Sequence, residues 1–163
     1  MRTMKVWSIV FTALYFSIGI VVVAGAQATP ATTYQESCGG CHLAYQPFLL
    51  PSGSWEKMLS RLPGHFGGQD VDLDPGTVKI LQAYLKANAA ENSSTKVARK
   101  IMDRLGRSLP ERITDVPYLQ HKHRKIDPAV FKKQSVGSLA NCIACHKTAA
   151  QGQFSEHNVS IPR

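Results

Sequence analysis

Two short motifs hold all four cysteines of the 163-residue chain, at positions 38–42 (CGGCH) and 142–146 (CIACH). In the pattern C-x-x-C-H, two thiols three positions apart on a helical turn reach the two vinyl groups of one porphyrin. The histidine that follows directly reaches the iron as the proximal ligand. The motifs therefore predict two covalently attached haem c groups. The attachment residues are Cys38, Cys41, Cys142 and Cys145, and the proximal ligands are His42 and His146.

Four cysteines in two C-x-x-C pairs also fit a zinc ribbon or two disulfide bonds. In a zinc ribbon about 15–20 residues separate the pairs, whereas about a hundred separate them here. Zinc also does not require a histidine directly after each pair. Two complete haem motifs in a chain with an export signal therefore favour a dihaem protein over both alternatives.

Each haem iron takes a sixth ligand, for which histidine and methionine are the candidates. Met58 and Met102 share helical faces with apolar residues, so we expect both to pack in the core. His65 lies in a turn framed by Pro63-Gly64 and Gly67-Gly68. Because glycine lets the backbone approach a flat cofactor closely, His65 is the predicted distal ligand of the first haem.

His121 and His123 are both candidates for the distal position of the second haem. They flank Lys122, and we expect one of the two to face solvent. His123 lies 23 residues before His146, just as His65 lies 23 residues after His42. We favour His123, with His121 as the alternative, and expect His157 in the polar tail to lie at the surface.

Two bis-histidine haems would have closed, six-coordinate, low-spin irons with no open position for a substrate. This favours an electron carrier over an enzyme. The alternative function is a dihaem oxidoreductase with one open haem site that acts on a small molecule such as peroxide.

Residues 1–26 have the anatomy of a secretory signal peptide. Arg2 and Lys5 precede an apolar run from residue 6 to residue 23, and small residues follow at 24–26. The signal predicts a periplasmic protein. The apolar run of about 18 residues is near the lower limit for spanning a bilayer, so an uncleaved membrane anchor is the alternative.

The chain is basic, with 19 Lys and Arg against 11 Asp and Glu and a formal charge of +8 at pH 7. Without Arg2 and Lys5 the charge is +6. An exported protein is not expected to meet nucleic acid. The charge serves either solubility or electrostatic steering towards an acidic partner or an anionic membrane surface.

Helical periodicity without sustained two-residue alternation predicts an all-α fold with extensive loops. Asp74 and Asp127 each precede a proline, as an N-cap precedes proline at the first helical position, and Ser54 is another predicted N-cap. The polar run 91–94 marks a boundary between an N-terminal haem domain (27–92) and a C-terminal one (93–163). The predicted helices cover 34–42, 54–62, 75–89, 95–107 and 128–133, with a helical turn in 138–147 and an extended stretch at 117–125.

Further short motifs follow one another in a characteristic order along most of the mature chain. They are Trp55-x-x-Met58, His65-Phe66, Ile80–Ala90, Arg112-Ile113-Thr114, Pro117-Tyr118, His123-Arg124-x-Ile126, Asn141–His146, Gly152-x-Phe154-Ser155-Glu156 and Val159-x-Ile161-Pro162. Through this set and the first haem motif, the chain resembles the dihaem cytochrome c family known as the partner of sphaeroides haem protein.

The resemblance implies a class I cytochrome c-like N-terminal domain and a smaller C-terminal haem domain. It implies bis-histidine ligation, which carries over by position to His65 and His123, while His121 departs from the pattern. It also implies electron transfer from a membrane cytochrome b or the quinol pool to an oxygen-binding monohaem cytochrome c.

Overall fold

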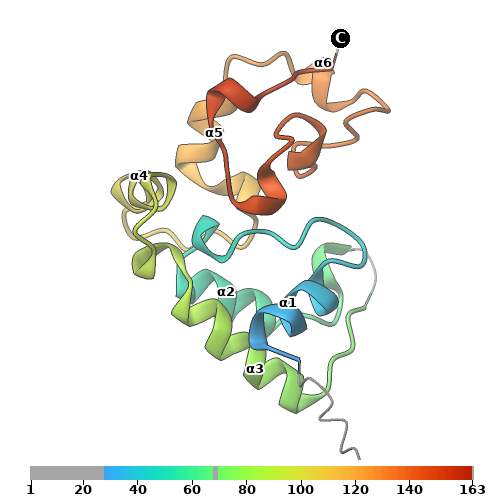
Figure 1. Cartoon of the computed structure of the whole chain (residues 1–163), viewed down its shortest axis with the longest axis vertical. Helices are drawn as coiled ribbons and strands as arrows, with labels where there is room; N and C mark the ends of the chain where they lie inside the picture. Colours follow the sequence, from blue (N-terminus) through green and yellow to red (C-terminus); the bar gives the residue numbers. More distant parts are fainter. Residues whose placement is uncertain (1–27, 68–69, 163) are drawn as a thin grey trace, which may run out of the picture.

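The structure is a computed structural model that describes residues 28–67 and 70–162; the predicted signal peptide lies outside this range. The described chain folds into six α-helices and seven 3₁₀-helices joined by loops (Figure 1). Its one β-type pairing is an isolated bridge between His146 and Val159. The predicted all-α fold with extensive loops is confirmed. None of these helices is both long and apolar enough to cross a membrane.

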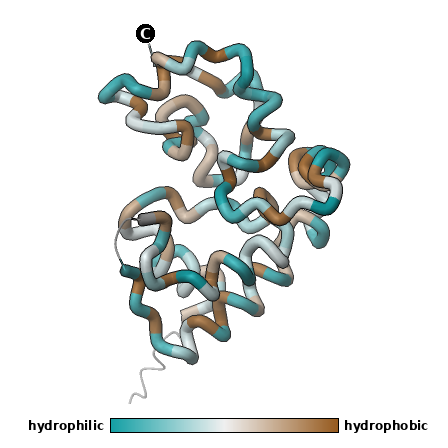
Figure 2. The backbone as a smooth tube through the Cα atoms, turned by 180° about the vertical axis from the view of Figure 1, so that it is seen from behind, coloured by the Kyte–Doolittle hydropathy of each residue, from teal (hydrophilic) through white to brown (hydrophobic). Residues whose placement is uncertain are grey.

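The first three α-helices pack together at the N-terminal end of the fold. They are α1 (Pro30–Cys38), α2 (Ser52–Leu59) and α3 (Pro75–Ala87), and α3 contacts both α1 and α2. Helix α3 begins as predicted, because the side chain of Asp74 accepts a hydrogen bond from the backbone N–H of Thr77. Leu81 and Leu85 on its inner side are fully buried. Hydrophobic and hydrophilic positions alternate along these helices, as one-sided burial requires (Figure 2).

The predicted bounds of α1 and α2 are both wrong. Helix α1 begins at Pro30 behind an N-cap at Thr29 and ends at Cys38, so most of the first haem motif lies in the turn after it. Helix α2 begins at Ser52, and Ser54 is buried inside it rather than capping it. The reason is a long-range contact: the carboxylate of Glu91 accepts the backbone N–H of Ser52 and caps the helix from outside.

Helix α4 (Lys96–Leu105) begins where predicted, with Thr95 accepting a hydrogen bond from the N–H of Ala98. Ala98 and Ile101 are fully buried in the same core cluster as the side chains of α3. This hydrophobic core thus continues beyond residue 92, while the division of the chain into domains 27–92 and 93–163 stays a prediction.

The remaining helices lie towards the C-terminus. Helix α5 (Pro117–His123) occupies the stretch that was predicted to be extended, because Pro117 begins a helix at its N1 position rather than breaking one. Helix α6 (Pro128–Phe131) is shorter than predicted. The 3₁₀-helices are η1 (Pro47–Leu49), η2 (His65–Gly67), η3 (Ala90–Asn92), η4 (Ile113–Asp115), η5 (Cys142–Ala144), η6 (Ala149–Gln151) and η7 (Glu156–Asn158).

We call residues 120–162 the C-terminal lobe, and the described residues before them the N-terminal lobe. The C-terminal lobe has a thin core of its own, since its buried apolar side chains are those of Val136, Ala144 and Ala149. The N-terminal lobe buries many larger side chains in one cluster. A lobe with so little apolar burial gains little free energy from packing alone.

The segment 45–48 of the N-terminal lobe contacts the C-terminal lobe. The Tyr45 hydroxyl donates to the carbonyl of Ala140 at 2.9 Å, and Gln46 Nε2 donates to the carbonyl of Ala150 at 2.9 Å. Phe48 meets Phe154 edge to face, with ring centroids 6.2 Å apart. These contacts fix one lobe against the other through both polar and apolar groups.

Candidate haem sites

The first attachment motif sits at the end of α1. Cys38 is the last residue of the helix, and Cys41 lies exposed in the turn that follows. The N–H of Gly39 continues the helical pattern to the carbonyl of Gln35 at 2.8 Å. A Cβ at position 39 would collide with that carbonyl oxygen, so glycine is the residue that fits this turn. The helix end thus presents the two cysteines without a side chain between them.

The second motif forms a tight helical turn. Cys142 and Ala144 bound η5, and Cys145 follows it directly. The N–H groups of Cys145 and His146 both donate to the carbonyl of Cys142, at 3.2 and 2.8 Å. This turn holds both cysteines and the histidine on one compact stretch of backbone, as attachment to a single porphyrin requires.

All four cysteine thiols are unpaired, so the disulfide alternative is not supported. Burial raises the pKa of the Cys38 thiol to about 11, and burial also raises the pKa of Cys142. These surroundings disfavour a charged thiolate and suit an uncharged thioether. Within residues 28–67 and 70–162, no group of three or more His, Cys, Asp or Glu side chains could hold a metal ion, which leaves no zinc-ribbon site in that part of the chain.

The structure brings the imidazoles of His42 and His65 together with their planes nearly parallel. Their ring centroids are 6.3 Å apart and their planes differ by 19°. Metal–imidazole bonds are about 2 Å long, so two imidazoles that share one ion have ring centroids about 6 Å apart. The Nδ1 of His42 donates to the carbonyl of Leu43 at 2.7 Å, which leaves Nε2 for the metal. These two imidazoles could therefore hold one haem iron between them.

His65 reaches this position from an unusual turn. Gly64 before it and Phe66 after it both have positive φ, at 75° and 51°, and for Phe66 this conformation is strained. The guanidinium of Arg112 lies over the Phe66 ring, 4.4 Å from its centroid, and the Asp70 carboxylate accepts the N–H of Gly64 at 2.6 Å. Burial, His42 and Arg112 lower the pKa of His65, which favours the neutral imidazole that binds metal.

A second imidazole pair joins α5 to the second attachment motif. His123 from α5 and His146 from the second motif have ring centroids 6.0 Å apart, with planes at 76°. The Nδ1 of His123 donates to the carbonyl of Leu119 at 2.7 Å. The Nδ1 of His146 is buried and has no protein hydrogen-bond partner. The spacing again matches two imidazoles that share one metal ion.

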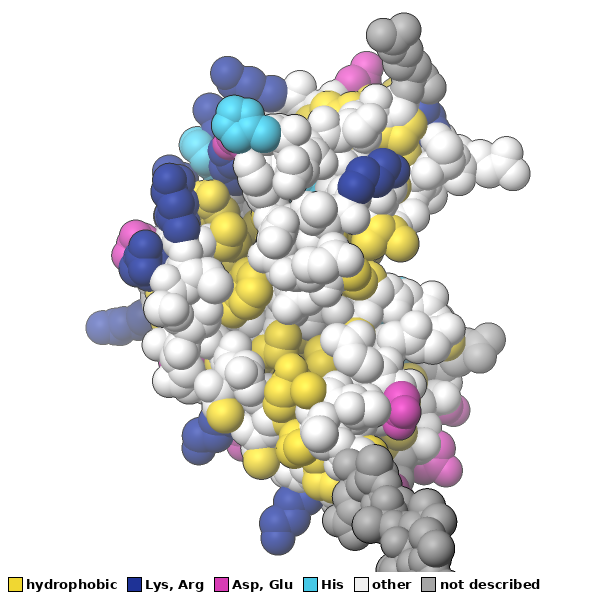
Figure 3. Space-filling view, in the orientation of Figure 1, with side chains coloured by type: hydrophobic (Ala, Val, Ile, Leu, Met, Phe, Trp, Pro, Cys, Tyr) yellow, Lys and Arg dark blue, Asp and Glu magenta, His cyan; other side chains and the backbone are white. Residues whose placement is uncertain are grey.

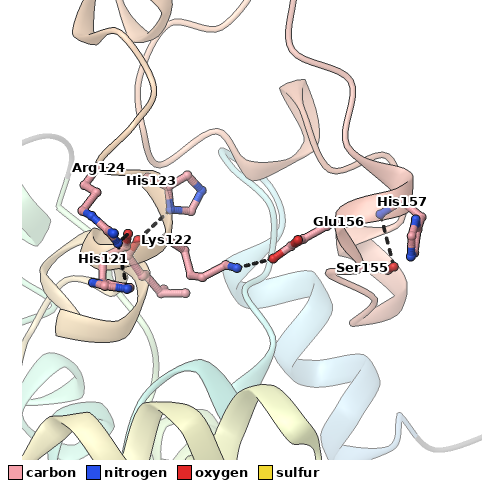
Figure 4. Close-up of polar contacts among 8 residues, drawn as sticks. His121, Lys122, His123, Arg124, Ser155, Glu156 and His157 are labelled. Atoms are coloured by element: carbon pink, nitrogen blue, oxygen red, sulfur yellow. Dashed lines mark hydrogen bonds and ion pairs between the residues drawn. The ribbon is translucent and has the colours of Figure 1, made fainter.

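His121 is directed away from this pair. It projects from α5 in another direction than His123 (Figure 4), and its Nε2 lies 2.7 Å from a guanidinium nitrogen of Arg124. Residues two apart share one face of an extended stretch but differ by about 200° around the axis of a helix, so the helical form of α5 is what separates these two side chains. The structure places His123 rather than His121 beside His146; the ligand assignment itself stays a prediction.

The other candidate side chains lie away from the imidazole pairs. His157 is exposed in η7. Met58 is buried in the core cluster, and Met102 packs against that cluster partly buried, which agrees with the expected packing role of both.

Three aromatic residues lie beside the imidazoles, and none of them was predicted from the sequence to belong to the haem sites. The Tyr45 ring stacks on His42 with centroids 5.0 Å apart, Phe66 lies 4.6 Å from His65, and Phe154 lies 5.6 Å from His146. Tyr45 and Phe66 follow their histidines closely in the chain, and aromatic residues so near candidate ligands are a usable sequence signal. Phe154 offers no such signal, since the fold brings it to His146.

Residues 34–154 match the family model of dihaem cytochrome c. The chain is similar to the diheme cytochrome c from Rhodobacter sphaeroides, with 35% identity and a TM-score of 0.63 over 75% of this chain and 94% of that one. It is also similar to the diheme cytochrome type c from Shewanella baltica OS155, with 30% identity and a TM-score of 0.66 over 82% of this chain and 94% of that one. No curated protein matches. With two attachment motifs and two imidazole pairs inside the matched region, the chain belongs to the dihaem cytochrome c family.

Proposed function

We propose that the protein carries electrons between redox partners through two covalently bound, bis-histidine haems. One observation carries this proposal: each proximal histidine faces a second imidazole at the spacing of a shared ion. An iron with both axial positions filled by protein has no open position at which to bind and turn over a substrate.

When bound, each haem supplies reversible one-electron chemistry between ferric and ferrous iron. The protein's own residues attach the haems and orient their ligands. Cys38, Cys41, Cys142 and Cys145 hold the groups by thioether bonds. The carbonyls of Leu43 and Leu119 orient two of the imidazoles through their Nδ1 atoms, so the ligands stay in place in both oxidation states.

Absorption spectra of the purified haem-loaded protein test this function. The pyridine haemochrome assay should give two haems per chain. The ferric spectrum should be entirely low-spin, and neither cyanide nor carbon monoxide should change it on mixing. A high-spin component that binds either ligand would contradict the carrier and favour a dihaem oxidoreductase acting on a small molecule such as peroxide.

We also propose that the protein is exported to the periplasm and works between other redox proteins. The resemblance described above supports a membrane cytochrome b or quinol-linked donor and an oxygen-binding monohaem cytochrome c as acceptor. The mass of the mature chain tests export, because cleavage after residue 26 removes the segment that otherwise anchors the protein.

The basic residues suit an acidic partner or an anionic membrane surface. Most Lys and Arg side chains in Figure 3 lie along the left edge, where Figure 1 shows α4. Exposed basic residues of this region are Lys96, Arg99, Lys100, Arg104 and Arg107, with Lys122, Arg124 and Lys125 on and after α5. Like charges gathered on one side steer an oppositely charged partner towards that side.

Steering predicts a salt-dependent rate. Electron exchange with an acidic redox protein should slow as salt is raised, since the Debye length falls from about 10 Å at 0.1 M to about 3 Å at 1 M. Stopped-flow kinetics measure this rate. Lys100→Glu should lower the rate at low salt more than Lys79→Glu, which makes the same charge change at an exposed position of α3. Equal effects of both variants, or a flat salt dependence, would leave the charge a role in solubility alone.

A further inference from the structure

We propose that Arg112 is a positioning residue for the distal ligand of the first haem. It acts through the Phe66 ring and keeps the turn around His65 in a conformation that the backbone alone would not hold. This role deepens the proposed carrier function and rests on it, because a carrier with a closed iron needs its distal imidazole held firmly in place.

The turn that presents His65 is strained at the next residue. Phe66 has φ 51° and ψ 31°, in the left-handed region that a bulky side chain seldom occupies. Such a conformation persists only where the surrounding residues hold it. The Phe66 ring is 42% exposed, so burial in the core does little to hold it. A contact from outside the core must therefore keep the turn in shape.

Arg112 provides this contact from a distant part of the sequence. Its guanidinium lies 4.4 Å from the centroid of the Phe66 ring, well within the range of a cation–π interaction. The centroid of the Phe66 ring lies in turn 4.6 Å from that of His65. A planar guanidinium also stacks on an aromatic face, which a compact ammonium group does not. One series of contacts thus leads from the guanidinium to the distal imidazole.

The backbone that carries Arg112 is anchored on both sides. The carboxylate of Glu111, the residue before it, pairs with Lys57 at 2.6 Å and with Arg61 at 2.9 Å. An isolated surface ion pair contributes little to stability, but several charges in one network hold a geometry better. Ile113, the residue after Arg112, is buried in the core cluster. The guanidinium therefore extends over Phe66 from a fixed point of the chain.

The guanidinium has two properties that can be measured separately. Its flat stack on Phe66 holds the ligand turn, which sets how often His65 leaves the iron. Its positive charge acts on the iron itself. Ferrous haem carries one positive charge less than ferric haem, so a nearby cation favours the reduced state. Arg112 should therefore slow the release of the distal ligand and also raise the reduction potential of the first haem.

Carbon monoxide measures how firmly the ligand is held in the full haem-loaded protein. It binds a ferrous bis-histidine haem only after one imidazole has left, so the slow binding rate at saturating gas reports ligand release. Arg112→Leu should raise this rate several-fold at one haem per chain and lower one of the two reduction potentials in a spectroelectrochemical titration. Arg112→Lys should raise the rate as well, because the flat stack is lost, but it should keep the potential, because the charge remains.

Arg99→Leu is the matched control, because it removes an exposed guanidinium that donates to the Ser94 carbonyl instead. It should leave the rate and both potentials near those of the unchanged protein. Phe66→Leu should raise the rate by itself, and adding Arg112→Leu should then change the rate no further.

An unchanged rate in Arg112→Leu, an equal rise in Arg99→Leu, or a full further rise when Arg112→Leu is added to Phe66→Leu would overturn this role for Arg112. Since Arg112 is exposed, its replacement leaves the hydrophobic core intact. Immediate binding of carbon monoxide by the unchanged protein would instead refute the bis-histidine carrier.

Discussion

Replacing His123 with alanine is expected to convert one of the two haems from low-spin to high-spin. His123 faces His146 at 6.0 Å between ring centroids, and the Leu119 carbonyl holds its Nδ1. Without this imidazole the second iron keeps the proximal His146 alone and gains an open position. The ferric absorption spectrum should show a high-spin component from half of the haem, and the reduced protein should bind carbon monoxide at one site per chain.

His121→Ala is the matched control for this variant. His121 lies on the same helix, two residues away, and its ring contacts Arg124 instead of the second site. Both haems should therefore stay low-spin in His121→Ala, and His65→Ala should open the first site alone. If His121→Ala becomes high-spin and His123→Ala does not, the distal assignment of the second haem is wrong.

Replacing Cys142 and Cys145 together with alanine is expected to remove one covalent haem and to unfold the C-terminal lobe. This lobe buries three apolar side chains, and two of them are alanines. Such a core recovers little of the conformational entropy that folding costs, about 1–2 kcal/mol per residue for the backbone. A bound haem adds a large apolar surface and a ligand bridge between α5 and the second motif.

Two measurements check the double variant. The pyridine haemochrome assay should fall from two haems per chain to one, and limited proteolysis should cut within residues 120–162 while the N-terminal lobe resists. The corresponding change of Cys38 and Cys41 is the control. It should also remove one haem, but the core around Leu81, Leu85 and Ile101 should keep the N-terminal lobe largely protected. A C-terminal lobe that resists protease without its haem would contradict this account.

Helix positions that depend on neighbouring residues could be predicted from the sequence. Asp74 and Thr95 cap α3 and α4 through hydrogen bonds to N–H groups three residues on. The start of α2 could not be predicted, because Glu91 caps it from 39 positions away. The helix at 117–123 was missed for a local reason, since Pro117 was interpreted as a break although proline also begins helices.

The residues of the candidate haem sites also fall into two groups, those that a local sequence pattern predicts and those that only the fold brings together. The attachment cysteines and proximal histidines are contiguous in sequence, so their pattern alone predicts their chemistry. The pairing of imidazoles is a property of the fold. It depends on the turn that holds His65 and on the helical form of α5, which directs His123 and His121 to different sides. The contact of Tyr45 with Ala140 joins residues 95 positions apart, and no local pattern encodes it.

The two imidazole pairs differ in the angle between their ring planes, and this difference should give the two haem centres different EPR signals. The planes of His42 and His65 are near parallel, at 19°, whereas those of His123 and His146 are near perpendicular, at 76°. In ferric low-spin haem, parallel axial imidazoles separate the iron d orbitals that carry the unpaired electron, and perpendicular ones leave them nearly degenerate. The oxidised protein should therefore give two distinct EPR signals, with the larger g anisotropy from the second centre. Each haem could then be followed separately in a redox titration, although their ligands are chemically the same.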